Sequence, residues 1–225
     1  MESNEGNINQ SLQINATHGR IMAAALELFA TRGFHGTGIR DIAGKAGVST
    51  ANLYHYTGSK ENLLFQLMQN ALAKLLAAAK AITEQYPDPR AALEQLVRMH
   101  VITHALSPMA SAVVDDQFGV LEGETRNSII EQRDRYEKFY GSVIKNGVSQ
   151  KLFSVPDESA ARLGLLEMLS GVARWYSPAG KFGPVEVAEI HVLLSLSLLG
   201  ADNKNPVTSN QPVLELVERI WGTKT

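Results

Sequence analysis

The chain has 225 residues, of which 44% are hydrophobic and 20% charged, an ordinary composition for a globular protein of one or two domains. It contains no cysteine, and this excludes disulfides, thiolate nucleophiles and thiolate metal ligands. The formal net charge of −2 does not by itself indicate a protein that binds nucleic acid.

The N-terminal segment "MESNEGNINQSLQIN" is polar and acidic, and it lacks the basic start and apolar run of a signal peptide. We expect residues 1–14 to form a disordered leader. The most apolar run, "IHVLLSLSLLG" at 190–200, is shorter than the roughly 18–20 residues that cross a bilayer. These features predict a cytoplasmic protein with no membrane partner.

Helical periodicity begins after this leader. Apolar residues from Ile21 to Phe29 recur at the spacing of an amphipathic helix, and three glycines between residues 31 and 38 end it. A helix of about two turns follows, with Thr37 as its expected N-cap, and Ser49 is placed to cap a second short helix that runs to residue 57. Ser59 is the expected cap of a long helix with a stripe of leucines on one face.

A proline-rich break lies at 86–90, and the boundary between this head and a helical body is predicted at or before it. Further helices are predicted near 90–106, 109–121, 124–150, 157–176 and 184–201, and a polar linker at 201–211 precedes a last amphipathic helix. Strand patterns are scarce, so the predicted fold class is all-α. The predicted domains are a three-helix head at 15–75, with a two-helix motif at 38–57, and a body at 76–225.

Two predicted helices of the body, at 160–172 and 185–199, are apolar on more than one face. Such helices are usually buried on all sides. Either their own domain surrounds them, or they pack against the same pair in a second copy and form a symmetric dimer. The candidate interface residues are Leu165, Met168, Leu169, Val172, Ile190, Leu194 and Leu198.

The segment 37–57 contains two short helices joined by a glycine-containing turn, which is the helix-turn-helix arrangement whose second helix enters the DNA major groove. Its second helix has few apolar anchors, and its polar side chains can bond base edges or phosphates. Flanking basic residues and helix caps suit phosphates. The candidate DNA-binding residues are Thr37, Arg40, Ser49, Thr50, Ala51, Asn52, Tyr54, His55, Tyr56 and Lys60.

Charge is distributed unevenly along the chain. Between residues 17 and 60 there are five basic and two acidic residues, a net charge of +3, while the remainder of the chain is acidic. Such an asymmetry is a modest indication of a polyanionic partner, although small positive excesses are often only solvated surface.

The segment "ALELFATRGFHGTGIRDIAGKAGVSTANLYHYTGSKENLL" at 25–64 resembles the DNA-binding head of the TetR family of bacterial transcriptional repressors. The resemblance covers about residues 15–75. It implies a three-helix head, an all-helical ligand-binding body, a homodimer, and a small molecule that lowers affinity for a palindromic operator. The departures are Tyr56-Thr57, where the family commonly has His-Phe, and Gly38, where a larger residue is usual.

The second half is similar to TetR repressors of fatty-acid, aromatic or steroid breakdown that sense acyl-CoA thioesters. The segments that carry this likeness are "RDRYEKFYGSVIKNGVSQKLF" and "LEMLSGVARWYSPAGKFGPVEVAEIHVLLSLSLL", above all Arg174-Trp175-Tyr176 with Pro178 and Gly180. The likeness implies an apolar effector, of which a CoA thioester is one form.

A ligand cavity in the body would use the apolar and polar side chains of its helices. His100 and His104 have the spacing of paired metal ligands, but the sequence nearby supplies no further ligands for a zinc site. They are therefore candidates to line a ligand cavity, with partial exposure as the alternative. Apolar residues of the body could line the same cavity or belong to the core, and arginines could hold an anion or pair on the surface. The candidate ligand-binding residues are His100, His104, Met109, Phe118, Arg126, Arg133, Met168, Arg174 and Trp175.

Catalytic motifs are missing from the sequence. "GIRDIAGKA" falls short of a phosphate-binding loop, "SVIK" stands without its partner motifs, and neither G-x-S-x-G nor H-E-x-x-H occurs. We therefore expect no enzyme, no cofactor and no metal. Two alternatives to a ligand-responsive repressor stay open: a DNA-binding regulator without an effector, and a helical small-molecule carrier without DNA function.

Overall fold

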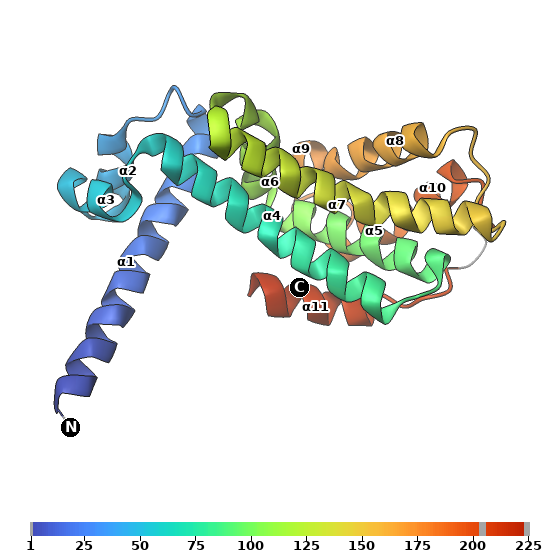
Figure 1. The fold of residues 1–225 in the computed structure, drawn as a ribbon, viewed down its shortest axis with the longest axis horizontal. Helices are drawn as coiled ribbons and strands as arrows, with labels where there is room; N and C mark the ends of the chain where they lie inside the picture. The colour runs from blue at the N-terminus through green and yellow to red at the C-terminus, as the bar shows by residue number, and fades with distance from the viewer. Residues whose placement is uncertain (1, 203–205, 223–225) are drawn as a thin grey trace.

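A computed structural model describes the backbone of residues 2–202 and 206–222, and the side chains of residues 15–202 and 206–222. Every regular element in these ranges is helical, which confirms the all-α prediction (Figure 1). The elements are α1 (Glu2–Arg32), α2 (Ile39–Ala46), α3 (Thr50–Thr57), α4 (Lys60–Gln85), α5 (Pro89–Leu106), α6 (Pro108–Asp116), the 3₁₀ turn η1 (Phe118–Val120), α7 (Gly123–Ser149), α8 (Glu158–Ser170), α9 (Val172–Trp175), α10 (Pro184–Leu198) and α11 (Gln211–Trp221). None of the helices in the described ranges is long and apolar enough to cross a membrane.

Side-chain caps set the start of several helices. Ser49 Oγ accepts from the backbone N–H of Asn52, and Ser59 Oγ accepts from that of Asn62, so both predicted caps are confirmed. Asp88 and Asp157 cap α5 and α8 in the same way.

Thr37 is not the N-cap of α2, and that prediction is wrong. The cap is Gly38, whose backbone N–H donates to the Asp41 carboxylate at 3.0 Å. The Thr37 side chain is buried instead, and its hydroxyl lies within hydrogen-bond distance of the carbonyls of Leu28 and Gly33.

The first of two apolar cores holds the head together. Residues of α1, α2 and α3 pack around the first half of α4, and Leu53 is the fully buried anchor of α3. Val113 and Val114 of α6 belong to the same core, as do Leu121 and Ile129. The head is therefore packed directly against the N-terminal end of α7 and against α6, as Figure 1 shows.

The second core fills the body, and α5 lies at its centre. Nearly every residue of α5 is buried by α4, α7, α8, α10 and α11. Helix α4 is continuous between the cores: Leu72 packs in the head core, while Leu75 and Leu76 pack against the body core. The predicted domain boundary at 75/76 thus falls inside one helix.

Some predicted boundaries differ from the observed ones. The helix expected at 157–176 is divided at Gly171 into α8 and α9, and the one expected at 109–121 ends at Asp116 and is followed by η1. Helix α1 extends back to Glu2, within the segment expected to be a disordered leader. The side chains of residues 1–14 lie outside the described residues, so the leader stays a prediction.

Candidate nucleic-acid interface and body pocket

The turn between α2 and α3 depends on one left-handed residue. Gly47 has φ +67°, which side chains disfavour, and its N–H donates to carbonyls in the last turn of α2. Helix α3 is then fixed by Leu53 in the head core and by Thr57, whose buried hydroxyl donates to the Leu53 carbonyl at 3.0 Å. The side of α3 that carries Leu53 and Thr57 therefore packs against the head, and the opposite side is exposed to solvent.

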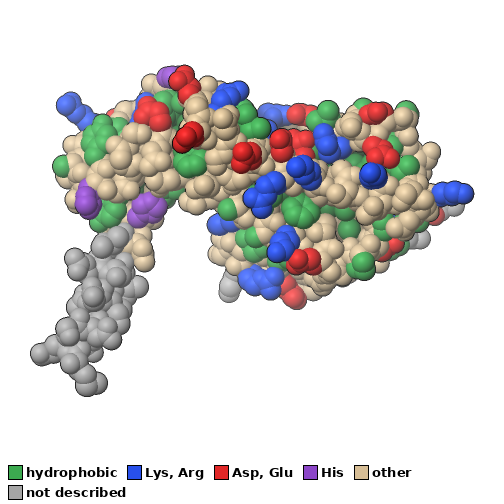
Figure 2. Space-filling model, viewed as in Figure 1, with side chains coloured by type: hydrophobic (Ala, Val, Ile, Leu, Met, Phe, Trp, Pro, Cys, Tyr) green, Lys and Arg blue, Asp and Glu red, His purple; other side chains and the backbone are tan. Residues whose placement is uncertain are grey.

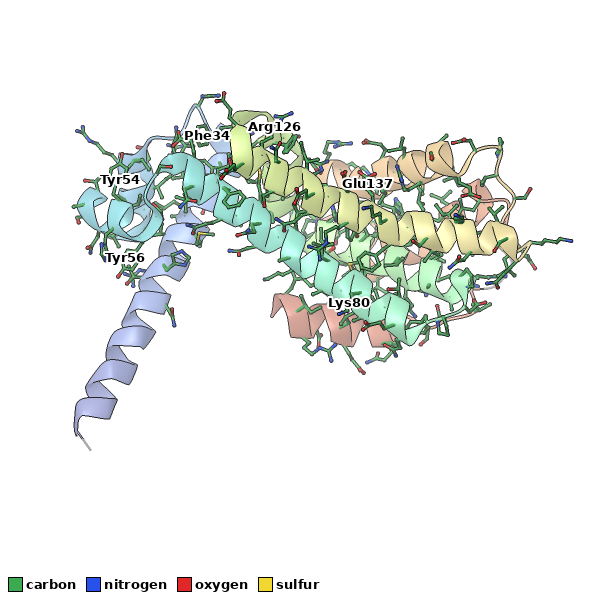
Figure 3. All side chains as sticks on the ribbon, in the orientation of Figure 1. Phe34, Tyr54, Tyr56, Lys80, Arg126 and Glu137 are labelled. Atoms are coloured by element: carbon green, nitrogen blue, oxygen red, sulfur yellow. The ribbon has the colours of Figure 1, made fainter. Side chains whose placement is uncertain are left out.

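The free side of α3 carries the predicted base-reading residues. Ala51, Asn52, Tyr54 and His55 are exposed, Tyr54 at 50%, and Ser49 is exposed at the start of the helix. In Figures 1 and 3, α3 with Tyr54 lies at the end of the molecule farthest from α8 and α10. These side chains can therefore reach a partner without rearrangement of the head.

Thr50 and Tyr56 are only partly accessible. Thr50 is half-buried, and Tyr56 packs against the head core, with its ring centroid 5.7 Å from that of His55. The aromatic body of Tyr56 therefore contributes packing to the head.

Two predicted phosphate contacts are engaged within the head. The first is Thr37, which is buried. The second is Lys60, whose Nζ donates to the carbonyls of Phe34 and Thr37 at 3.0 Å each and lies 4.0 Å from the centre of the Phe34 ring. Arg40 is exposed and has no hydrogen bond or ion pair with any described residue, so it is the predicted cation that remains available to a phosphate.

Away from the head, charges of both signs are mixed. On the face drawn in Figure 2, lysine and arginine side chains alternate with aspartate and glutamate over the body. A long basic track across the body is therefore not visible on that face.

The body contains a cavity of about 130 Å³ between α4, α5, α6, α7 and α8, and Trp221 of α11 also lines it. His100, His104 and Arg133 line this pocket, as the sequence predicts. Leu72 and Val114 line it too and at the same time belong to the head core. The pocket thus adjoins the packing that holds the head.

Stacked histidines form one wall of the pocket. The rings of His100 and His104 lie 4.0 Å apart at an interplanar angle of 9°. Burial lowers the pKa of His100 well below its usual range, and it lowers the pKa of His104 to about 4. Both imidazoles are therefore neutral at physiological pH, and no group of three or more potential metal ligands occurs among the described residues.

A chain of polar groups extends from His100 to the back of the pocket. His100 Nδ1 lies 2.9 Å from the hydroxyl of Tyr136, which lies 3.2 Å from that of Tyr140. Tyr140 donates to the Leu96 carbonyl at 3.0 Å, and His100 Nε2 lies 3.2 Å from Ser170 Oγ. This network ties α5, α7 and α8 together behind the cavity.

Carboxylates outnumber cations in the pocket lining. Asp115, Glu137 and Glu167 line the pocket with one cation, Arg133, whose guanidinium lies 3.7 Å from Asp115. Burial raises the pKa of Asp115, and the Arg133 charge partly offsets this. Glu137, labelled in Figure 3, pairs with Arg162 at 3.4 Å.

The other predicted ligand-binding residues do not line this pocket, and for this cavity the prediction is wrong. The Phe118 ring packs against the head core beneath the guanidinium groups of Arg126 and Arg133. Met168 packs against the body core. The remaining residues are exposed: Met109, Arg174 and Trp175. Tyr136 and Ser170, which the sequence did not single out, line the cavity instead.

The predicted dimer face divides into two groups. Leu165, Leu169 and Val172 are fully buried in their own chain, and Met168 is half-buried against it, so these four do not form an open face. Ile190, Leu194 and Leu198 are exposed, as the dimer prediction requires. Three further apolar residues, at the end of α9, between α9 and α10 and on α10, are exposed and were not predicted for this face: Trp175, Phe182 and Leu193.

Comparisons with known proteins agree with this architecture. Residues 21–67 match the family described as bacterial regulatory proteins, tetR family, and residues 86–199 match the tetracyclin repressor-like C-terminal domain. The HTH-type transcriptional repressor KstR2 of Mycobacterium tuberculosis is 27% identical over 188 residues, which cover 82% of this chain and 93% of that protein.

Solved structures show the same fold. The TetR family regulator PfmR from Thermus thermophilus is similar with a TM-score of 0.73 and 31% identity, over 81% of this chain and 98% of PfmR. AibR, crystallised with isovaleryl coenzyme A and operator DNA, is similar with a TM-score of 0.74 over 79% of this chain and 97% of AibR; at 22% identity this likeness shows the fold alone.

An exposed helix-turn-helix at one end, with a helical body that contains a pocket behind it, is the architecture of a DNA-binding transcriptional regulator. The chain belongs to the TetR family of bacterial transcriptional regulators.

Proposed function

We propose that the protein is a homodimeric repressor that binds a palindromic operator through α3 and is released by a small-molecule effector in the body pocket. The observation that carries the proposal is the exposed polar side of α3, held by Leu53 and Thr57 with Asn52, Tyr54 and His55 free. Asn can bond adenine bidentately, and Tyr can bond base edges or phosphates. A cytoplasmic location, where DNA is accessible, follows from this role.

The effector site we propose is the cavity lined by His100, His104 and Arg133. Because Leu72 and Val114 line it while packing in the head core, a ligand that displaces them changes the packing of the head. A coupling of about 1–3 kcal/mol is sufficient for a roughly 5–150-fold loss of operator affinity.

A CoA thioester is the effector class that we propose. The support is the similarity to KstR2, called a ketosteroid transcriptional regulator, and the fold shared with AibR, crystallised with isovaleryl coenzyme A. The acyl group is the part that suits a mainly apolar cavity. Thermal-shift screening with CoA thioesters tests this, because a ligand that binds the native state raises its melting temperature. If no thioester has any effect, the regulator without an effector is favoured.

The DNA role is tested with a double variant, Asn52→Ala/Tyr54→Ala. Operator fragments are first selected from genomic DNA with the native protein, and affinity is then measured by fluorescence anisotropy at several salt concentrations. We expect at least a roughly 100-fold weaker affinity, because each base contact contributes about 1–3 kcal/mol, in a protein with unchanged circular dichroism. Lys80→Ala, at the far exposed end of α4 (Figure 3), is the control and should bind normally. Native affinity in the double variant would refute the proposal.

A further inference from the structure

The hydrogen-bond network that joins His100, Tyr136 and Tyr140 ends at the backbone carbonyl of Leu96. The position of each hydrogen in the network can be assigned from that end. The Leu96 carbonyl can only accept a hydrogen bond, so the Tyr140 hydroxyl must donate its hydrogen to this carbonyl. Tyr136 must then donate to Tyr140, which leaves the Tyr136 oxygen as an acceptor for His100 Nδ1–H. A neutral His100 has no second hydrogen, so its Nε2 accepts the hydroxyl hydrogen of Ser170.

The hydrogen of the neutral His104 ring is also fixed by a carbonyl group. Its Nδ1 lies 2.8 Å from the backbone carbonyl of His100, which can only accept, so the hydrogen is on Nδ1. Nε2 of the neutral ring is therefore a bare acceptor. His104 is only 6% exposed, it lines the pocket, and none of the described residues donates to this nitrogen.

Two hydroxyl groups of the lining, those of Thr103 and Ser111, have also committed their hydrogens. The Thr103 hydroxyl lies 2.8 Å from the Met99 carbonyl and 2.9 Å from the His100 carbonyl, and the Ser111 hydroxyl donates to the Ser107 carbonyl. Beside His104 the lining therefore presents a bare acceptor, and three carboxylates line the pocket as well, with Asp115 paired to Arg133 and Glu137 paired to Arg162. The remaining donors of the lining are the Ser107 hydroxyl and the Trp221 indole N–H.

We propose that the group that enters this pocket is uncharged and carries a hydrogen-bond donor, a hydroxyl or an N–H, which it gives to His104 Nε2. This rests on the proposed function of the cavity as the effector site. A donor satisfies an acceptor that faces the pocket, whereas a carbonyl, an ether oxygen or a carboxylate would place a second lone pair against it. The acidic lining further disfavours an anionic group. For a CoA thioester, the inference selects an acyl group that bears a hydroxyl.

The test compares four small probes of similar size: cyclohexanol, cyclohexanone, methoxycyclohexane and cyclohexanecarboxylate. Their dissociation constants are measured by NMR titration of the native full-length protein. We expect cyclohexanol to bind about tenfold more tightly than the ketone or the ether, which corresponds to roughly 1.4 kcal/mol for the added hydrogen bond, and the carboxylate to bind most weakly.

Two variants and a spectroscopic readout assign the effect to one atom. His104→Phe should abolish the preference for the alcohol, and His104→Gln should reduce it if the Phe variant does not fold. His35→Phe, the same change at an exposed histidine of the head, should retain the preference. In protein labelled with ¹⁵N-histidine, His104 Nε2 should resonate as an unprotonated nitrogen and move upfield on addition of cyclohexanol.

The outcomes separate this inference from the proposed function. Equal or weaker binding of cyclohexanol than of methoxycyclohexane, or a proton on His104 Nε2, would overturn the inference while leaving an effector pocket. If none of the probes binds and no CoA thioester weakens operator binding, then the effector role of the cavity fails, and the inference fails with it.

Discussion

At the scale of the residue, His104 couples the stability of the protein to pH. Burial lowers its folded pKa to about 4 from an unfolded value of 6.5, so below pH 6.5 the unfolded state binds the additional proton. The free energy of unfolding is therefore unaffected by protonation of this residue above pH 6.5, where the ring is neutral in both states. It decreases as the pH falls from 6.5 towards 4. Acidification from about pH 7.5 to about pH 5 should lower the free energy of unfolding by about 2 kcal/mol through this residue.

Urea denaturation at both pH values measures this loss. His104→Gln should have a smaller drop in the free energy of unfolding between the two pH values than the native protein. His35→Gln, a change at an exposed histidine of the head, should leave the drop as it is. An equal drop in the His104 variant would show that the ring does not control the acid sensitivity.

Residue type and position along the chain predicted some roles but not side-chain direction. Ser49 and Ser59 cap their helices as predicted, because an N-cap depends on local sequence. Thr37 and Lys60 instead serve the packing between α1, α2 and α4, which only the tertiary structure determines. His100 and His104 were found through their spacing, whereas Tyr136 and Ser170 have no local pattern that marks them as pocket residues.

At the scale of the element, α6 joins the pocket to the head. Its residues Ala110 and Asp115 line the pocket, while Val113 packs in the head core. Just beyond α6, the side-chain oxygen of Gln117 accepts the Phe34 backbone N–H at 2.9 Å, and the Phe34 carbonyl accepts from Lys60. Figure 3 shows Phe34 near the start of α7, where the head meets the body.

Gln117→Ala should weaken the transmission of effector binding to the DNA. We expect the effector to bind with native affinity but to reduce operator affinity several-fold less, because the bond between α6 and the head turn is lost. Isothermal titration for the effector and anisotropy for the operator measure the two parts separately. Gln132→Ala on α7 is the matched control. A native coupling factor in Gln117→Ala would exclude this route.

A second element-scale feature holds the segment before α11. Buried Arg98 of α5 pairs with Glu189 of α10 at 2.8 Å and with the Thr208 hydroxyl at 2.6 Å. Glu94 accepts from the backbone N–H groups of Val207 and Thr208. The segment at 207–208 is thus fixed to α5 by charged groups.

Arg98→Met should destabilise the protein by about 3 kcal/mol or more. The change leaves Glu94 and Glu189 without this partner, and the removal of one member of a buried charge network is more costly than the loss of a surface pair. Lys80→Ala breaks an exposed pair with Glu84 and should change the free energy of unfolding by less than about 1 kcal/mol. Both values come from urea denaturation at one protein concentration.

The same packing explains which elements could be predicted from sequence. The periodicity of apolar residues was sufficient to predict that the helices exist. It also predicted the head, where the residues of the helix-turn-helix motif follow one another closely. It could not identify α5 as the central helix, because that helix buries Glu94, Arg98 and His100, whose charge and polarity are satisfied only by distant segments. The apolar pattern of α10 predicted burial either by its own domain or by a second copy, and periodicity could not decide between them; the exposure of Leu194 and Leu198 agrees with the second copy.

At the scale of the whole molecule, helix α10 has apolar residues that no other part of the described chain covers. Ile190, Leu193, Leu194 and Leu198 are each more than a third exposed, and such a cluster of apolar side chains indicates a partner. A second copy of the same helix is the partner that we propose, since two heads are needed to read a palindrome. In that assembly, α10 sets the separation of the two α3 helices.

Leu194→Glu should therefore convert the dimer to a monomer and weaken operator binding at least tenfold, although the change is far from α3. The carboxylate is solvated in the monomer, so the free chain keeps its helical content, whereas in the dimer two charges would be buried beside each other. Light scattering after size exclusion gives the mass, and anisotropy gives the affinity. Ile130→Glu on α7, outside this surface, should stay dimeric. A dimeric Leu194→Glu with native operator affinity would mean that another surface joins the two copies, because a dimer through α10 requires this leucine to be buried.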